Sequence, residues 1–409
     1  MAQIQKANGI IDWLDQRLAV KPLMKVLMTE YWIPKNINFL WAMGVVLVVL
    51  FTLLVVSGLF LLMYYKPDTK LAFDSVNYTI MQEVAYGWFW RHLHAVSASV
   101  CFLIIYIHMF VAIYYGSYKN GREMIWVTGM VLFGLFSAEA FSGYMLPWGQ
   151  MSYWAAAVIT NLFGGIPVIG PDLVVWIRGN FIVADATLTR FFMLHVVLLP
   201  VVIMLVIAVH FYSLRIPHVN NMYGEEIDFE KEAEKFKAGN KKESKVIPFW
   251  PMFLSKDFFV ASFFLAILFY LTCYHYSFAL DPINFDPADH LKTPPHIYPE
   301  WYFLWSYEIL RGFFFSADLG LIAFGIANVV FILLPWLDRS KVVAPAHKRP
   351  GFMIFFWLLV ADMIILTIWG KLPPTGINAY IGFAATIVFL ALLFVFLPII
   401  TKSEDKKQA

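Results

Sequence analysis

The fold is decided by two apolar stretches, RHLHAVSASVCFLIIYIHMF (residues 91–110) and FFMLHVVLLPVVIMLVIAVHF (residues 191–211). The first contains His94 and His108, 14 residues apart, and the second contains His195 and His210, 15 apart. Because an α-helix turns about 100° per residue, each pair lies within about 40° or about 60° of one helix face, about 21 Å apart along the axis. Two such helices packed together would present one histidine pair near each side of a bilayer. This geometry suits two stacked hemes, each held by two imidazoles.

The composition places the chain in a membrane. Of its 409 residues 60% are hydrophobic and 14% are charged, whereas soluble proteins have about 25% charged residues. Runs of roughly 20 apolar residues, enough to span a bilayer, recur along the chain. We predict an all-α integral membrane protein with eight transmembrane helices, of which the first four form a diheme bundle. The predicted spans are 37–65, 90–115, 125–147, 190–214, 257–280, 317–338, 350–371 and 378–400.

The distribution of positive charge predicts the orientation. The segments 1–36, 116–124, 215–256, 338–349 and 401–409 together hold 22 of the 30 Lys and Arg residues. Since cytoplasmic connections carry the excess of positive charge, both termini are expected in the cytoplasm. The net charge of +2 therefore says little about partners.

Two further features limit the possible processing and chemistry. The first apolar run is too long for the core of a cleavable signal peptide. Cys101 and Cys273 lie inside apolar runs, and we expect both to be small buried residues. The motif Cys-x-x-Cys-His, which attaches heme covalently, does not occur in the sequence.

The sequence divides into two predicted membrane domains joined by one long polar stretch. We predict a cytoplasmic amphipathic segment (1–36), a diheme bundle (37–214), a solvated cytoplasmic linker (215–255), a C-terminal domain of four helices (256–400) and a cytoplasmic tail (401–409). The connections 148–189 and 281–316 are rich in aromatic residues, so neither is a flexible linker. The first of them is expected to form short helices on the membrane surface.

The four histidines are most simply explained as heme ligands. A single intramembrane histidine could merely bond to a backbone carbonyl, but burying polar groups in lipid is costly, and four at near-equal spacings favour a shared ligand. Two pairs of glycines repeat the 14-residue period and would give a porphyrin room, because glycine permits close approach. Small residues also mediate ordinary helix packing in membranes. The glycines are Gly44, Gly58, Gly129 and Gly143.

Arginines precede the first histidine of each stretch. Arg91 and Arg190 lie at the predicted outer helix ends and could pair with the heme propionates. The alternative is that both extend their charged ends from the membrane into water.

Two acidic groups could handle protons. Glu300 lies in the string Pro299-Glu300-Trp301-Tyr302 on the predicted outer side, where aromatic walls would raise its pKa toward neutrality. It could equally be a helix-capping carboxylate. Lys256 and Asp257 open the fifth span on the inner side and could deliver protons, or could anchor the helix at the interface.

These residues make the chain resemble a known family. Four segments are similar to cytochrome b, the membrane core of quinol–cytochrome c oxidoreductase, and the resemblance covers about 30–400. The segments are RHLHA (91–95), GYMLPWGQMS (143–152), ATLTRFF (186–192) and PEWY (299–302).

The resemblance implies a pathway for electrons. His94 and His195 would hold a low-potential heme, and His108 and His210 a high-potential heme. Quinol would be oxidised on the outer side. One electron would pass to a Rieske iron–sulfur partner and from there to a cytochrome c. The other electron would cross the membrane through the two hemes and reduce a quinone on the inner side. The residues implied at the outer site are Gly149, Tyr153, Glu300, Tyr302 and Tyr307, with Glu300 accepting a proton. Those implied at the inner site are Lys256 and Asp257.

The resemblance also implies an assembly and a location, and the sequence departs from the family at several points. A homodimeric complex in the inner membrane of a bacterium is expected.

The second histidine pair is spaced by 15 residues, as in the photosynthetic relatives. Those relatives are split into two chains, whereas this chain is continuous. Val111 stands where many mitochondrial members have an arginine. Arg215 and His218 lie where an inner-site histidine is often found, so the details of inner quinone binding stay open.

Two other classes of membrane protein could use paired intramembrane histidines. A diheme membrane anchor of another quinol or quinone oxidoreductase would need only about five helices, so the last helices and the PEWY string argue against it. A transporter could use the histidines for proton relay, and it would contain no heme.

Overall fold

The computed structural model describes residues 9–406, so the ends of the predicted segments 1–36 and 401–409 lie outside the described residues. Most of the chain is helical, as expected where lipid offers no partners to backbone N–H and C=O groups. Within residues 9–406, seven helices are long and apolar enough to cross a membrane, and an eighth apolar helix, Ala317–Ile332, is shorter. The prediction of a helical membrane protein is confirmed, although one small two-stranded sheet is also present, and the predicted count of eight full spans is not confirmed.

The histidine-bearing helices belong to the first four spans. Helix α3 (Met43–Leu62) packs against α5 (Gly87–Tyr114), and α6 (Glu123–Met145) packs against α10 (Leu199–Arg215). Helix α9 (Asp185–Met193) continues through a π-helical turn into α10, giving one span over Asp185–Arg215.

This fourth span starts at Asp185, before the predicted residue 190. Thr187 explains the earlier start, because its hydroxyl accepts a hydrogen bond from the Ala184 N–H at 3.1 Å and satisfies a free donor at the helix end. Asp185 adds a negative charge in the first turn, where the helix dipole favours it.

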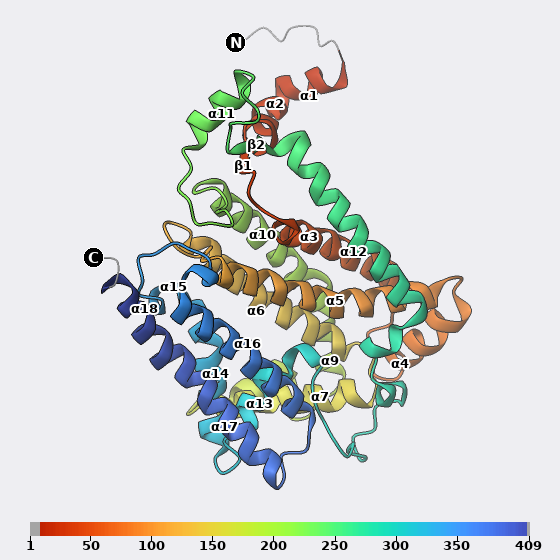
Figure 1. The fold of residues 1–409 in the computed structure, drawn as a ribbon. Helices are drawn as coiled ribbons and strands as arrows, with labels where there is room; N and C mark the ends of the chain where they lie inside the picture. The colour runs from red at the N-terminus through yellow and green to blue at the C-terminus, as the bar shows by residue number, and fades with distance from the viewer. Residues whose placement is uncertain (1–8, 407–409) are drawn as a thin grey trace.

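Helix α12 (Leu254–Tyr274) packs against α3 and α5, along the edge of the first four helices (Figure 1). Its buried residues recur every three to seven positions and therefore share one face. Cys273 lies off that face and is exposed, so the prediction that both cysteines are buried is wrong for Cys273 and confirmed for Cys101. The helix ends at Tyr274, before the predicted residue 280.

The remaining long helices form a second group. Helix α13 (Leu304–Gly312) contacts α14 (Ala317–Ile332), α16 (Pro350–Lys371) and α17 (Ile377–Ala391), which lie together in Figure 1. A π-helical turn joins α17 to α18 (Leu397–Lys406). Helix α14 stops before the predicted residue 338, and α15 (Leu334–Leu337) forms a separate turn. Pro335, which has no N–H to donate, lies at this break.

Short elements fill the connections. Two helices, α7 (Gln150–Leu162) and α8 (Gly170–Arg178), occupy the connection in which short helices were expected. The predicted linker 215–255 is not an extended chain: it contains α11 (Phe229–Lys237), and β2 (Val246–Pro248) pairs antiparallel with β1 (Trp32–Pro34). The other short helices are α1 (Ile10–Leu18), α2 (Val20–Met24) and α4 (Ala72–Asp74).

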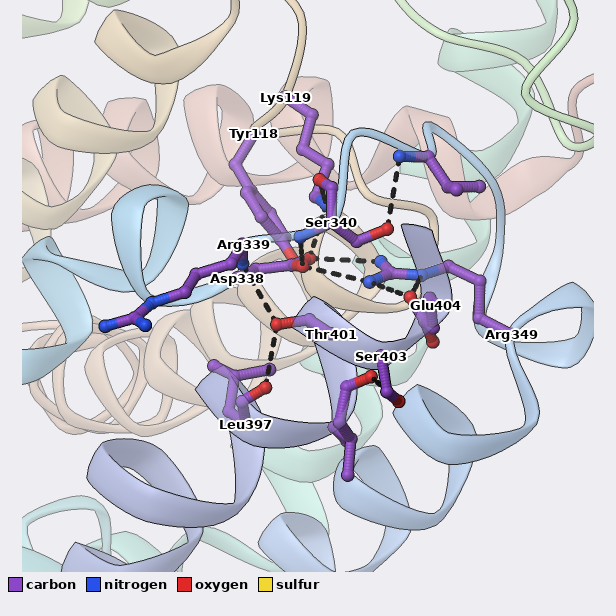
Figure 2. Close-up of polar contacts among 12 residues, drawn as sticks. Tyr118, Lys119, Asp338, Arg339, Ser340, Arg349, Leu397, Thr401, Ser403 and Glu404 are labelled. Atoms are coloured by element: carbon purple, nitrogen blue, oxygen red, sulfur yellow. Dashed lines mark hydrogen bonds and ion pairs between the residues drawn. The ribbon is translucent and has the colours of Figure 1, made fainter. Parts of the chain in front are cut away.

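A buried ionic cluster ties the α5–α6 connection to the C-terminal helices (Figure 2). The Asp338 carboxylate is fully buried and accepts hydrogen bonds from Arg349 at 2.9 and 3.0 Å and from the Tyr118 hydroxyl at 2.6 Å. Lys119 Nζ lies 2.8 Å from the same carboxylate. Glu404 of α18 completes the cluster, 2.8 Å from Arg349.

The two cations determine the charge state of this cluster. Burial alone would raise the pKa of Asp338, but Arg349 and Lys119 outweigh burial and lower it. Burial also lowers the pKa of Lys119, to about 8, although Asp338 opposes the change. Removing one partner of such a cluster leaves an uncompensated buried charge, which is strongly destabilising.

Asp338→Asn is therefore expected to destabilise the folded chain by about 3–5 kcal/mol, measured as a lower Tm of the detergent-solubilised protein. Arg339→Gln is the matched control, because Arg339 is exposed and its side chain points away from the cluster in Figure 2. An Asp338→Asn protein with the parent's Tm would show that the cluster does not stabilise the fold.

Candidate functional site

The four histidines lie on two helices of the first bundle, as their spacing predicted. His94 and His108 belong to α5, and His195 and His210 belong to the span Asp185–Arg215. The rings of His94 and His195 face each other with centroids 6.1 Å apart and planes inclined by 84°. His108 and His210 are close enough to interact electrostatically. The fold thus pairs the histidines across the two helices at two levels.

Hydroxyl groups orient two of the imidazoles. The Ser57 hydroxyl donates its proton to the Leu53 carbonyl at 2.6 Å, so it can only accept from His94 Nδ1, which is 2.9 Å away. Thr128 repeats the pattern, donating to the Met124 carbonyl at 2.8 Å and lying 2.9 Å from His210 Nδ1. Each Nδ1 therefore carries the ring proton, and the lone pair of Nε2 is free to bind a metal.

His195 meets a backbone acceptor instead. Its Nδ1 lies 3.0 Å from the carbonyl oxygen of Glu139 on α6, which selects the same tautomer. Neutral imidazoles with a free Nε2, paired across two helices, fit two bis-histidine heme sites.

Each predicted glycine lies against one of these imidazoles. A Cβ on Gly143 would lie 2.8 Å from His195 Nδ1, and one on Gly58 would lie 3.2 Å from His94 Cε1. The inner pair is similar. A Cβ on Gly129 would lie 3.3 Å from His210 Cε1, and a Cβ on Gly44 would lie 3.7 Å from His108 Cε1. The glycines leave room for the histidine rings themselves.

The outer histidines open into a cavity that is also lined by polar groups from α5, from α6 and from the segment before α13. Arg91, Tyr144 and Glu300 line it together with His94 and His195. Arg91 can therefore reach a group bound in this cavity.

Arg190 is placed differently. It is exposed, donates to the Trp176 carbonyl, and packs its guanidinium against Gly179, so it does not line this cavity in the described part of the chain. Its predicted contact with a propionate is not formed in this conformation.

Glu300 does not use its side chain as a helix cap, although it precedes the helical turn Trp301–Phe303. It lines the outer cavity instead, where burial, and secondarily the charge of Asp281, raises its pKa to about 7. A carboxyl with that pKa exchanges a proton easily at neutral pH. The capping alternative is therefore not supported.

The segment around Glu300 separates two cavities. Tyr302 is buried, stacks on Phe102 at 3.9 Å and faces the same cavity as Glu300. Pro299 and Tyr307 line a second, almost wholly apolar cavity of about 410 Å³, and the Tyr307 hydroxyl donates to the Ile297 carbonyl at 3.1 Å. Glu300 itself lines only the first cavity, while its sequence neighbour Pro299 lines the second.

Tyr153 lies on α7, half-buried against Trp148 at a ring distance of 5.8 Å. It lines neither of these two cavities in the described chain. The structure therefore does not bring it together with Glu300, Tyr302 and Tyr307.

The predicted inner residues differ from each other in burial. Asp257 is buried, and its Oδ1 has no hydrogen-bond partner among the described residues, whereas the neighbouring Lys256 is exposed. Phe253, one turn earlier, packs in a cluster with Tyr31. An unpaired buried carboxyl at this end of α12 could deliver a proton to a bound molecule.

Arg215 and His218 gather around Tyr31. The Arg215 guanidinium lies 3.8 Å from the centre of the Tyr31 ring, and His218 stacks on the same ring at 5.0 Å. Both retain an unpartnered buried nitrogen, Arg215 Nη1 and His218 Nδ1, within the described chain. These donors face the inner end of the bundle, where the sequence left the details open.

Sequence reasoning missed four residues of this site. Ser57, Thr128 and Glu139 contact heme-ligand candidates, and Asp281 acts on Glu300. Glu139 could have been found, because a carboxyl inside the predicted span 125–147 is costly unless it has a function. Hydroxyl residues inside membrane helices carry no comparable signal.

Comparisons with known families match both parts of the chain. The family described as cytochrome b/b6/petB matches residues 28–217, and the one described as cytochrome b(C-terminal)/b6/petD matches residues 287–390.

Individual relatives match along almost the whole length. Cytochrome b of Rhodobacter capsulatus is 40% identical over 418 residues, covering 97% of this chain and 92% of the relative. Cytochrome b of Rickettsia bellii is 42% identical over 402 residues, covering 98% and 95%. A chain of a hyperthermophilic respiratory complex III superposes with a TM-score of 0.86 at 37% identity, covering 97% of this chain and 99% of that one.

The glycine contacts generate a test on heme content. Gly143→Ala places a methyl group against the ring of His195, so we expect the outer b-type heme to be lost or reduced in redox difference spectra. Gly134→Ala on the same helix is the control, because a Cβ there meets nothing within 4 Å. Full heme content in the Gly143→Ala protein would contradict this role.

Proposed function

The chain belongs to the cytochrome b family, and we propose that it is the transmembrane electron-transfer subunit of a respiratory quinol–cytochrome c oxidoreductase. In this role it oxidises quinol at an outer site and reduces quinone at an inner site, which couples electron transfer to proton translocation. The observation that carries the proposal is the pairing of four imidazoles, three of them oriented by an acceptor at Nδ1, at two levels between α5 and the span Asp185–Arg215.

The proposal assigns two non-covalent b-type hemes. His94 and His195 would hold the low-potential heme, and His108 and His210 the high-potential heme. When bound, these groups supply single-electron carriers between the two sides of the membrane. The protein holds three of the imidazoles in the ligating tautomer and leaves room beside all four with glycines. Arg91 would pair with a propionate.

The outer site would lie at the second cavity. An apolar cavity suits a quinol ring, and Tyr307 and Pro299 line it. Glu300, across the same segment, accepts a proton from the hydroxyl of the ring and passes it outward, as its pKa of about 7 permits. Tyr302 supports this segment, because its backbone carbonyl accepts a hydrogen bond from the Tyr106 hydroxyl at 2.5 Å. Tyr153 would reach the site only after moving.

The inner site would lie near the start of α12. Asp257 is the proposed proton donor to the reduced quinone, and its unpartnered oxygen supports this role. Lys256 is exposed next to it and would supply protons from the aqueous side. Quinone binding there would draw on Arg215 and His218.

The wider setting follows from the family and from the charge distribution. We propose a Rieske iron–sulfur protein and a c-type cytochrome as partner subunits, in a homodimeric complex. The excess of Lys and Arg in the connections supports a location of both termini in the cytoplasm of a bacterium, with the chain in the inner membrane. Within it, residues 37–214 form the diheme domain and residues 256–400 the C-terminal domain, on either side of the segment 215–255.

The diheme-anchor alternative is less well supported. A diheme membrane anchor does not require the second cavity or the helices α13 and α14 that line it. Residues of α13 instead bring an apolar cavity next to a proton-exchanging carboxyl, which serves quinol oxidation.

The proposed role of Glu300 predicts that the rate of quinol oxidation depends on pH and on the Glu300 carboxyl. Only the unprotonated carboxyl accepts a proton, so quinol oxidation is expected to speed up as pH rises through about 7. Glu300→Gln should slow steady-state quinol oxidation by about 100-fold and remove this rise, with both heme spectra intact. Parental turnover of the variant at pH 7 would exclude Glu300 from the mechanism.

A further inference from the structure

A carboxylate lies beside one of the four proposed heme ligands. Glu139 is on α6, one turn before Gly143, and its Oε1 is 3.1 Å from His195 Nδ1. The backbone oxygen of the same residue is 3.0 Å from the same nitrogen. The ring nitrogen of His195 that bonds to the Glu139 backbone oxygen therefore also has the ionisable carboxyl of the same residue within 3.1 Å.

This contact differs from those of the other oriented histidines. His94 and His210 meet the hydroxyls of Ser57 and Thr128, which are neutral acceptors. A carboxylate is a stronger acceptor than a hydroxyl, and its hydrogen bonds are correspondingly stronger. The outer histidine pair thus has an ionisable group beside a ring nitrogen, which Thr128 does not provide to His210 at the inner level.

The surroundings do not neutralise Glu139 by pairing. Its side chain is 17% exposed, and its Oε2 is buried without a hydrogen-bond partner among the described residues. Within residues 9–406, His195 is the one group within ion-pair distance of it. Glu139 and His195 both line the outer cavity. The carboxyl is therefore directed at the ligand.

Such a contact changes the metal that the imidazole binds. A carboxylate that accepts the Nδ1 proton makes the ring a stronger electron donor through Nε2. Greater donation and a nearby negative charge favour the oxidised iron over the reduced iron. Hydrogen bonding around the axial ligand is one of the means by which a protein sets a heme potential.

We propose that Glu139 is a positioning residue that orients His195 and lowers the reduction potential of the outer heme relative to the inner heme. The inference rests on the proposed function, because it requires His195 to be a heme ligand. A lower outer potential drives electrons inward, where the membrane potential opposes them. Glu139 would thus help set the direction of electron flow.

The test is a potentiometric titration of the two b-type components in the purified complex. Glu139→Gln keeps the shape of the side chain without a negative charge. We expect the ratio of reduced to oxidised outer heme at fixed potential to rise about tenfold, which is 59 mV for one electron. The inner component should not move. Glu139→Asp, which keeps the carboxylate, should remain closer to the parent.

Thr128→Val is the matched variant at the inner level. It removes the neutral acceptor of His210 without changing charge, so it should shift the inner component less than Glu139→Gln shifts the outer one. If Glu139→Gln fails to retain the outer heme, Glu139→Thr supplies a neutral hydroxyl and gives the same test. An outer midpoint unchanged in these neutral variants, or an equal shift of both components, would overturn the inference. A parent complex without two b-type components would instead overturn the proposed function, and this inference with it.

Discussion

The structure depends on holding four imidazoles inside a membrane, three of them with a recorded acceptor for the ring proton. Lipid provides no partner for an Nδ1 proton, so each oriented ring needs an acceptor from a neighbouring helix. Ser57 on α3 and both Thr128 and Glu139 on α6 supply these acceptors. The glycines beside the rings let the same helices come close enough to do so. Helix packing and ligand orientation are thus one arrangement, and a change in either alters the other.

In the proposed function, two levels of histidines separate the two quinone sites by the thickness of the bilayer. Moving one charge across a membrane costs about 2.3 kcal/mol per 100 mV, so the two proton-handling sites must lie on opposite sides to conserve that energy. Glu300 lies in the connection before α13, and Asp257 lies at the start of α12, beside the cluster around Tyr31. The PEWY segment matters because it keeps an apolar cavity and the outer histidine cavity on its two sides.

The sequence predicted the parts of this site that a period or a local motif determines. The spacings of 14 and 15 identified the paired histidines, and the matching period of Gly44, Gly58, Gly129 and Gly143 identified the residues opposite them. Contacts between segments that are distant along the chain could not be predicted from the sequence. Arg190 turns to Trp176 because α8 returns beside it, and the linker folds because Val246–Pro248 finds Trp32–Pro34. The exposure of Cys273 depends on which face of α12 is covered. Glu139 was overlooked although a carboxyl in an apolar run is itself a signal.

The central claim is that two pairs of histidines bind two hemes, and heme stoichiometry tests it most directly. The purified chain in its complex should contain two non-covalent b-type hemes, and His195→Ala should contain one, with the inner component retained in redox difference spectra. Two hemes in the His195→Ala protein, or fewer than two in the parent, would contradict the account.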